Sequence, residues 1–371
     1  MRRDILQIAK LLLAVVATSV GVALTYVVFE HLVTHLVPSI WDDVFWTDTV
    51  RLFVLPASVL LSLLYFWAQH HFDPQSEKHE EHALGDVPDA TPKNFVKILS
   101  IGLLSMLAGA TLGVESILVP ACIILGMYVA GKLVPSPRMK KALGAVGFIA
   151  LFTAFFHSFI MGMLALYLLK QSQGLKLQLK TIVLAAIASG TTMFALGVLP
   201  GGGEHYLSLP NQKVELTLGT VTIALFLVAA GYATTYLIRY AHDFSVALKN
   251  HIPKDNWLKH GIVAGTGIAA LYLLGGSLVQ FTGNLSIAPM LHRAPELGTI
   301  GLLWLVLVKS VAIGWSKALG YRGGLIFPTV FVASAFVDIA LLHTQGVNFH
   351  FGLILVMVGA FIANRKLRVL V

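Results

Sequence analysis

The chain is built from long apolar runs that are separated by short polar connections. Most of the runs approach the length of about 20 residues with which a helix crosses a bilayer. The first run exceeds the core of about 7–15 apolar residues found in a signal peptide, so we expect it to be retained as a first helix. The pattern predicts an all-α, polytopic membrane protein. The runs cover residues 5–37, 52–69, 95–113, 117–134, 142–169 (interrupted near 156–158), 181–199, 216–240, 262–281, 301–319, 325–342 and 351–362.

The composition agrees with a chain that is surrounded by lipid. Of its 371 residues, 57% are hydrophobic and 12% are charged, whereas a typical soluble domain has about 25% charged residues. This balance argues against a soluble enzyme, a nucleic-acid-binding protein and a disordered chain. The single cysteine, Cys122, has no partner for an internal disulfide. We therefore expect one transmembrane domain over residues 1–371 that needs no cofactor or metal and is not an enzyme.

Two of the apolar runs break at corresponding places in the two halves of the chain. The halves are taken as residues 5–200 and 216–371, and the breaks at Gly113 and at residues 320–324 both end 108 residues after the start of their half (113 − 5 and 324 − 216). Interrupted apolar segments in matching positions of a repeat indicate a binding site in transporter folds. Equal halves would extend to about residue 410, so we expect about 40 further residues beyond Val371.

The first break contains an acid between two apolar runs. Glu115 is the only acidic residue between Asp89 and Glu204, and it lies where a new apolar helix is predicted to begin. The first N–H groups of a helix are unpaired and carry partial positive charge, so they attract an anion. Glu115 is then either a gate, displaced by protonation or by a competing anion, or a helix cap with no other role.

The second break, residues 320–328, has the same design without the acid. Its glycines allow a close backbone approach, and Pro328 suits the first turn of a helix. The backbone N–H groups of Ile326 and Phe327 would then face the same cavity as those of the first break, and amides alone would bind a permeating anion. The alternative is a glycine-rich turn between helices. The predicted anion-binding residues are Gly113, Ser116, Ile117, Gly324, Ile326 and Phe327.

These residues resemble a known family. Residues 110–115 (ATLGVE), followed by an apolar helix, resemble the first-half signature of the CLC chloride channels and transporters, in which Gly-x-Glu carries the gating glutamate. Residues 309–333 resemble the second-half signature, in which a lysine helix leads to a Gly-x-Phe-x-Pro loop, and residues 205–210 (HYLSLP) resemble a bacterial ion-transport branch. The resemblance implies an inverted repeat with broken or re-entrant helices. It also implies a channel or passive transporter for chloride or another small anion, forming a homodimer in a bacterial plasma membrane.

The chain departs from the family pattern in ways that bear on mechanism. Residues 113–117 lack the arginine, second glycine and proline of the common motif, and Ile326 replaces the usual filter phenylalanine. The family's chloride-coordinating tyrosine would lie beyond Val371, and Leu168 stands where proton-coupled members carry a second glutamate. Two alternatives therefore stay open: a proton-coupled exchanger that uses Asp338, or a truncated remnant that does not conduct.

Other polar residues could support the site. Ser76 lies at the distance expected of the family's serine loop, although that loop has no recognisable motif here. Arg322 could steer anions by its field or anchor to headgroups, and Asp338 could transfer protons or lie near a helix end or subunit interface. Lys97 and Lys309 are expected to snorkel to a membrane interface.

Overall fold

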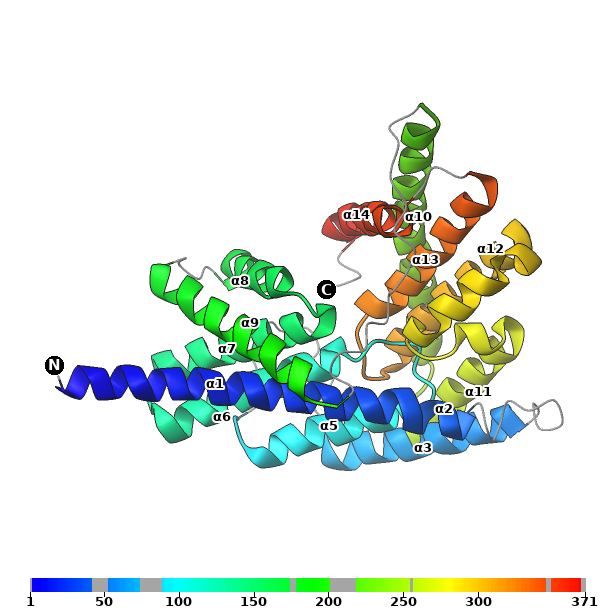
Figure 1. The fold of residues 1–371 in the computed structure, drawn as a ribbon. Coiled ribbons are helices and arrows are strands. Elements are labelled where there is room, and N and C mark those ends of the chain that lie inside the picture. Colours follow the sequence, from blue (N-terminus) through cyan, green and yellow to red (C-terminus); the bar gives the residue numbers. More distant parts are fainter. Residues whose placement is uncertain are drawn as a thin grey trace. The chain divides into compact units, whose positions relative to one another are not determined.

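The computed structural model of the protein describes residues 2–41, 53–73, 89–173, 178–200, 218–253, 256–344 and 348–367. These residues form helices and one isolated backbone bridge, so the predicted all-α class is confirmed (Figure 1). The helices are α1 (Arg2–His31), η1 (Leu32–Leu36), α2 (Val37–Ile40), α3 (Val54–Phe72), α5 (Pro92–Leu107), α6 (Glu115–Leu133), α7 (Pro137–Phe156), α8 (Phe159–Gln173), α9 (Leu179–Val198), α10 (Leu218–Lys249), α11 (Trp257–Gly275), η4 (Ser277–Val279), η5 (Asn284–Ser286), α12 (Ile287–Leu319), α13 (Ile326–His343) and α14 (Phe349–Leu367).

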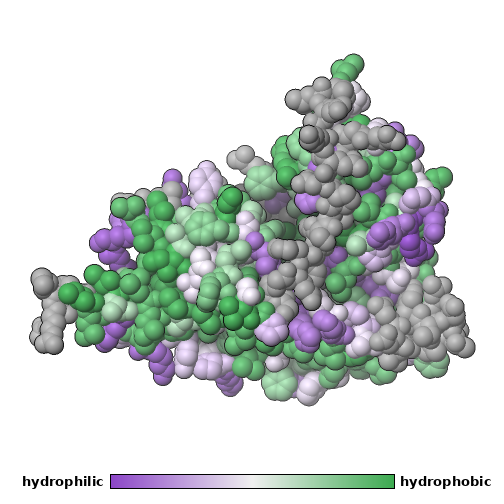
Figure 2. All heavy atoms as spheres, viewed as in Figure 1, coloured by the Kyte–Doolittle hydropathy of each residue, from purple (hydrophilic) through white to green (hydrophobic). Residues whose placement is uncertain are grey.

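Within the described chain, eight helical segments are long and apolar enough to cross a membrane. Large apolar side chains are exposed on their outer faces, among them Ile8 of α1, Phe194 of α9 and Leu225 of α10. Figure 2 shows such hydrophobic side chains, in green, over much of the visible surface. An exterior of this kind is unfavourable in water and matches the acyl chains of a bilayer. The chain is therefore a multi-pass membrane protein, as the sequence predicted.

Two of the predicted apolar runs are interrupted by a residue of positive φ, at which the helix ends. The interruption predicted within residues 142–169 is confirmed at His157, whose φ of +44° ends α7 before α8 begins. The single helix predicted over residues 262–281 is wrong. α11 stops at Gly275, because Gly276 has a φ of +75° that no helix can continue. The apolar residues that follow belong to an irregular loop, which hydrophobicity alone does not distinguish from a helix.

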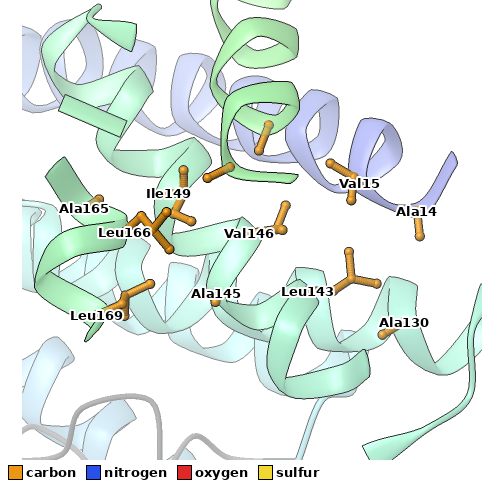
Figure 3. Close-up of a cluster of buried hydrophobic side chains, with 12 residues drawn as sticks. Ala14, Val15, Ala130, Leu143, Ala145, Val146, Ile149, Ala165, Leu166 and Leu169 are labelled. Carbon is orange, nitrogen blue, oxygen red and sulfur yellow. The ribbon is translucent and has the colours of Figure 1, made fainter. Parts of the chain in front are cut away.

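The first of two compact units holds the described parts of Met1–Leu36, Gln75–Ser100 and Ser116–His205. In it α1 packs on α7 and α9, and α8 packs on the same two helices. Small and branched aliphatic side chains fill the space between these helices (Figure 3), which keeps the helix axes close. The labelled residues of this core are Ala14, Val15, Ala130, Leu143, Ala145, Val146, Ile149, Ala165, Leu166 and Leu169.

The second unit holds the described parts of Val37–Pro74, Ile101–Glu115 and Tyr206–Val371. α3 packs on α11, α10 packs on α14 and α12, and α12 packs on α13. The unit thus contains segments from both halves of the sequence. Because it holds the end of α5, Glu115 and the start of α13, it includes both predicted helix breaks.

Candidate functional site

The first break begins where glycine ends a helix. Beyond α5, Gly109 has a φ of +90°, which favours glycine because it has no Cβ. Its backbone N–H donates to the carbonyl of Met106 (3.0 Å), and the N–H of Ala110 donates to the carbonyl of Ser105 (3.1 Å). This pair of bonds is the Schellman arrangement, which satisfies the last carbonyls of a helix.

The second break begins in the same way. Gly320, after α12, has a φ of +94°. Its N–H donates to the carbonyl of Lys317 (3.2 Å), and the N–H of Tyr321 donates to the carbonyl of Ser316 (3.0 Å). The two helix ends therefore have the same capping pattern. The next helix starts six residues after each glycine, at Glu115 and at Ile326.

The two breaks meet through a pair of backbone hydrogen bonds. The N–H of Gly113 donates to the carbonyl of Gly324, and the N–H of Gly324 donates to the carbonyl of Gly113, both at 2.7 Å. The predicted meeting of the breaks is thereby confirmed. The residues also correspond, since 324 − 113 and 320 − 109 both give 211. Position by position, Glu115 is matched by Ile326.

Glu115 reaches across this junction. Its side chain is 6% exposed, and Oε1 accepts a hydrogen bond from the backbone N–H of Ile326 at 2.7 Å. The N–H groups of Glu115 itself and of Phe327 also lie close to the carboxylate. Among the described residues Oε2 has no hydrogen-bond partner. The carboxylate therefore occupies the positive end of α13 with only one of its oxygens firmly bound.

Two glycines provide the space for that carboxylate. A Cβ atom built on Gly113 would lie 1.9 Å from Glu115 Oε2, and one built on Gly324 would lie 2.2 Å from Oε1. Both distances are far below any real contact, so a larger residue at either position must displace the carboxylate. The glycines thus have a steric role at the site in addition to their backbone pairing.

Each break is also held by a side-chain hydrogen bond to the helix that precedes the other break: α5 contacts the second break, and α12 contacts the first. Ser105 of α5 donates its hydroxyl to the carbonyl of Arg322 (2.8 Å). Ser316 of α12 accepts the backbone N–H of Thr111 through its hydroxyl oxygen (3.1 Å). Since Ser105 and Ser316 are again 211 residues apart (316 − 105), the repeat is preserved in side-chain contacts. The bracing restricts how far one break can move without the other.

Solved structures that resemble this fold include CLC proteins. A slow cyanobacterial Cl⁻/H⁺ antiporter superposes with a TM-score of 0.70 at 17% identity, over 95% of this chain and 85% of that one. A CLC-type fluoride/proton antiporter gives 0.66 at 16% identity, over 96% of each chain. The chain has the CLC transporter fold. A eukaryotic CLC transporter gives 0.67 at 12% identity, over 97% of this chain and 72% of that one.

Proteins related to this chain in sequence match a smaller part of it. Two proteins of Salmonella newport and Salmonella agona, each named "Putative ion-transport protein YfeO", are 27% identical over 146 residues. The match covers 38% of this chain and 32% of each relative, so it spans about a third of their length. No protein-family model matches the chain.

Within the CLC fold, Arg322 is a buried partner of the second break. Its Nη1 lies 3.2 Å from Oδ2 of Asp73, and both side chains are 6% exposed. A guanidinium so enclosed does not reach lipid headgroups, and its charge is balanced by the carboxylate. The pair instead ties the second break to Asp73, just beyond the end of α3. Within the same helix, Tyr65 donates its hydroxyl to the carbonyl of Gly320 (2.9 Å).

The remaining predicted residues are placed differently. Ile117 is buried, and Ser116 is half-buried with a hydroxyl that has no hydrogen-bond partner in the described part of the chain. Both belong to the first compact unit, and their role in binding an anion stays a prediction. Ser76 lies outside the described residues. Asp338 is 1% exposed within α13.

Lys309 corrects one expectation outright. It does not snorkel to an interface, because its side chain is 0% exposed and its Nζ is bonded to three backbone carbonyls. Sequence reasoning also failed to identify the bracing serines and the helix-capping role of Gly109 and Gly320. A shift of 211 residues would have found them, since it places Ser105 on Ser316 and Gly109 on Gly320.

Proposed function

We propose that the protein is a passive membrane transporter or channel for a small anion, with chloride as the expected ion and Glu115 as its gate. The observation that carries the proposal is the hydrogen bond from the N–H of Ile326 to the buried Glu115 carboxylate. A carboxylate that is bound at the N-terminus of another helix, here α13, occupies the position that a free anion would take. The CLC-fold neighbours named as chloride and fluoride antiporters support the choice of a halide.

The proposed mechanism is competition for backbone amides. When Glu115 swings out, the N–H groups of Ile326 and Phe327 become available to an incoming anion, and Gly113 and Gly324 leave room for it. Amides bind a partly dehydrated ion without a cationic side chain in direct contact, so the ion can also leave. Oε2, which has no hydrogen-bond partner in the described part of the chain, fits a group that must be displaced, because fewer hydrogen bonds have to be broken.

Protonation is expected to open the same gate. A neutral carboxyl group loses its attraction to the helix N-terminus and accepts a weaker hydrogen bond. Anion flux should therefore rise as pH falls. The homodimeric state and the bacterial plasma membrane stay predictions that rest on the family resemblance.

The proposal is tested by chloride efflux from liposomes that contain the purified protein. A hydrogen bond to a charged group contributes about 1 kcal/mol more than one between neutral groups, so Glu115→Gln should raise flux at pH 7.5 by about five- to tenfold and flatten its pH dependence. Glu296→Gln, which changes an exposed glutamate of α12, is the matched control. If both Glu115→Gln and Glu115→Ala leave rate and pH dependence at wild-type values, the gate assignment is wrong. If the wild-type protein carries no anion, the transport proposal itself fails.

A second candidate, proton-coupled exchange, is favoured by Asp338. Neither of its carboxylate oxygens has a hydrogen-bond partner among the described residues, and an unpaired buried acid is suited to carrying a proton. It lies twelve residues beyond Ile326 along α13, a rise of about 18 Å, so it would act apart from the gate. A chloride gradient should then drive proton movement that Asp338→Asn abolishes. Absence of coupled proton movement in the wild type rejects this candidate.

A further inference from the structure

Two buried tyrosines hold the breaks at equivalent points. Tyr272 of α11 donates its hydroxyl to the carbonyl of Gly109 (2.6 Å), and Tyr65 of α3 donates its hydroxyl to the carbonyl of Gly320 (2.9 Å). Both acceptors are the glycines of positive φ at which the preceding helices end. A carbonyl at this position lies beyond the helix and receives no hydrogen bond from it. Each tyrosine therefore fixes the backbone at the point where it leaves its helix.

The hydroxyl groups of these tyrosines are used within the protein. The oxygen of Tyr272 also accepts the backbone N–H of Phe281 (2.8 Å) and lies 3.3 Å from Oγ1 of Thr111. The ring of Tyr65 stacks on that of Tyr321, with the ring centroids 5.5 Å apart. A phenol has a single O–H donor, and in both residues a glycine carbonyl accepts it. The two hydroxyls thus hold backbone and are not donors to an anion.

The tyrosines belong to two helices in close contact. α3 packs on α11, and a Cβ built on Gly265 of α11 would lie 2.7 Å from the carbonyl oxygen of Ser58 in α3. One built on Gly261 would lie 2.9 Å from the Cα of Leu63. Ser58 also donates its hydroxyl to the carbonyl of Gly265 (3.0 Å). Glycines at such a contact let the helix backbones approach closely, so the pair forms a common support for both tyrosines.

The two tyrosine bonds follow the repeat of the chain. The acceptor glycines are 211 residues apart (320 − 109), whereas the tyrosines are 207 residues apart (272 − 65). The difference of four residues is about one helical turn. The donors thus come from positions one turn apart in α3 and α11, yet they reach the same point of each break. The same bond is present in both halves, as expected if both breaks need a fixed position.

We propose that Tyr65 and Tyr272 are positioning residues of the anion site. They hold the two breaks to one pair of helices, at the spacing at which the amides of Ile326 and Phe327 can bind a small monovalent anion. The inference rests on the proposed function, because it assumes that an anion binds where Glu115 now lies. Donors that are already in place lose less entropy when the ion binds. Loss of either hydroxyl should therefore weaken anion binding more than it slows the maximal rate.

The test is chloride flux over a range of chloride concentrations, measured in the Glu115→Ala background so that no carboxylate competes for the amides. Tyr272→Phe and Tyr65→Phe each remove one oxygen and keep the ring. Each should raise the half-saturating chloride concentration about fivefold, the effect of one hydrogen bond, with the maximal rate changed by less than about twofold. Tyr240→Phe, at an exposed position of α10, should change neither quantity. Unchanged half-saturation in either folded variant, or a loss of maximal rate alone, would overturn the inference.

A further variant keeps the test valid if Tyr272→Phe does not fold. Thr282 donates its hydroxyl to the carbonyl of Leu112 (3.0 Å), the residue before Gly113, so Thr282→Val removes another bond to the first break. In the same background it should also raise the half-saturating chloride concentration, and an unchanged value in a folded Thr282→Val protein contradicts the proposal. Wild-type protein that carries no anion refutes the proposed function, whereas an active wild type with unaffected tyrosine and threonine variants refutes this inference alone.

Discussion

Replacing Gly324 by alanine would move the carboxylate of Glu115, the proposed gate, without changing any atom of that residue. A Cβ at this position lies 2.2 Å from Glu115 Oε1 and 2.4 Å from its Cγ. Gly324 is not among the glycines of positive φ, so alanine can adopt its backbone. The Glu115 side chain is the nearest obstacle, and it has to give way.

The size of the effect follows from the distances. A carbon–oxygen contact needs at least about 3.2 Å, so the carboxylate must retreat by about 1 Å. The hydrogen bond from Ile326, now 2.7 Å long, would lengthen beyond the range of a real bond. A hydrogen bond to a charged group contributes about 1.5–3 kcal/mol. Its loss should shift the competition between gate and anion by about ten- to a hundredfold in favour of the anion.

The assay is chloride efflux at pH 7.5, where Glu115 in the wild type holds the site most firmly. Gly324→Ala should raise flux towards the level of Glu115→Ala and flatten its pH dependence. The double variant should match Glu115→Ala alone, because two changes that act through one group are not additive. Gly190→Ala is the control, since a Cβ at that position of α9 meets no atom within 4 Å.

One result would refute this reasoning. If Gly324→Ala lowers flux, and lowers it by the same factor in the Glu115→Ala background, the added methyl group obstructs the ion directly. The carboxylate would then not be the group whose position limits transport.

The structure makes three further predictions. Wild-type flux should increase as pH falls through the titration of Glu115, because protonation removes the charge that the helix N-terminus binds; flux measured between pH 4.5 and 7.5 checks the sign. Asp73→Ala or Arg322→Ala should each destabilise the protein by about 3–5 kcal/mol, because each leaves a buried charge without its partner. In thermal unfolding the double variant should be more stable than either single variant. A double variant that is less stable than both contradicts the pairing. Ser105→Ala and Ser316→Ala should each cost about 1 kcal/mol by the same measurement, since each removes a bond to the opposite break.

The parts of the site that the sequence predicted are those specified by local signals. A glycine, then an acid, then an apolar run define where α6 begins, and Gly324 with Pro328 defines the start of α13. Each of these signals consists of a few neighbouring residues, and the positions of helix termini depend on such short-range patterns. The positions of both breaks could therefore be identified before any contact was known.

The contacts across the junction required the structure. Ser105 and Arg322 are 217 residues apart, and no local pattern indicates that they touch. Lys309 is a second example. A lysine in an apolar run has a flexible side chain that commonly reaches a membrane interface. Only the structure shows that the backbone of residues 279–281 places three carbonyl acceptors at its Nζ. The loop itself was missed because its residues are as apolar as those of a helix.

The repeat explains why one acid serves two helix ends. A shift of 211 residues places Glu115 on Ile326 (326 − 115), and the backbone N–H groups of these two residues both lie close to the same carboxylate. The junction thus offers equivalent donors from each half to a single negative charge. A second acid at position 326 would bring two buried carboxylates together, and like charges at that distance repel. The apolar side chain of Ile326 leaves the shared position to one charge at a time, either the Glu115 carboxylate or the proposed anion. This is the condition under which the two would compete.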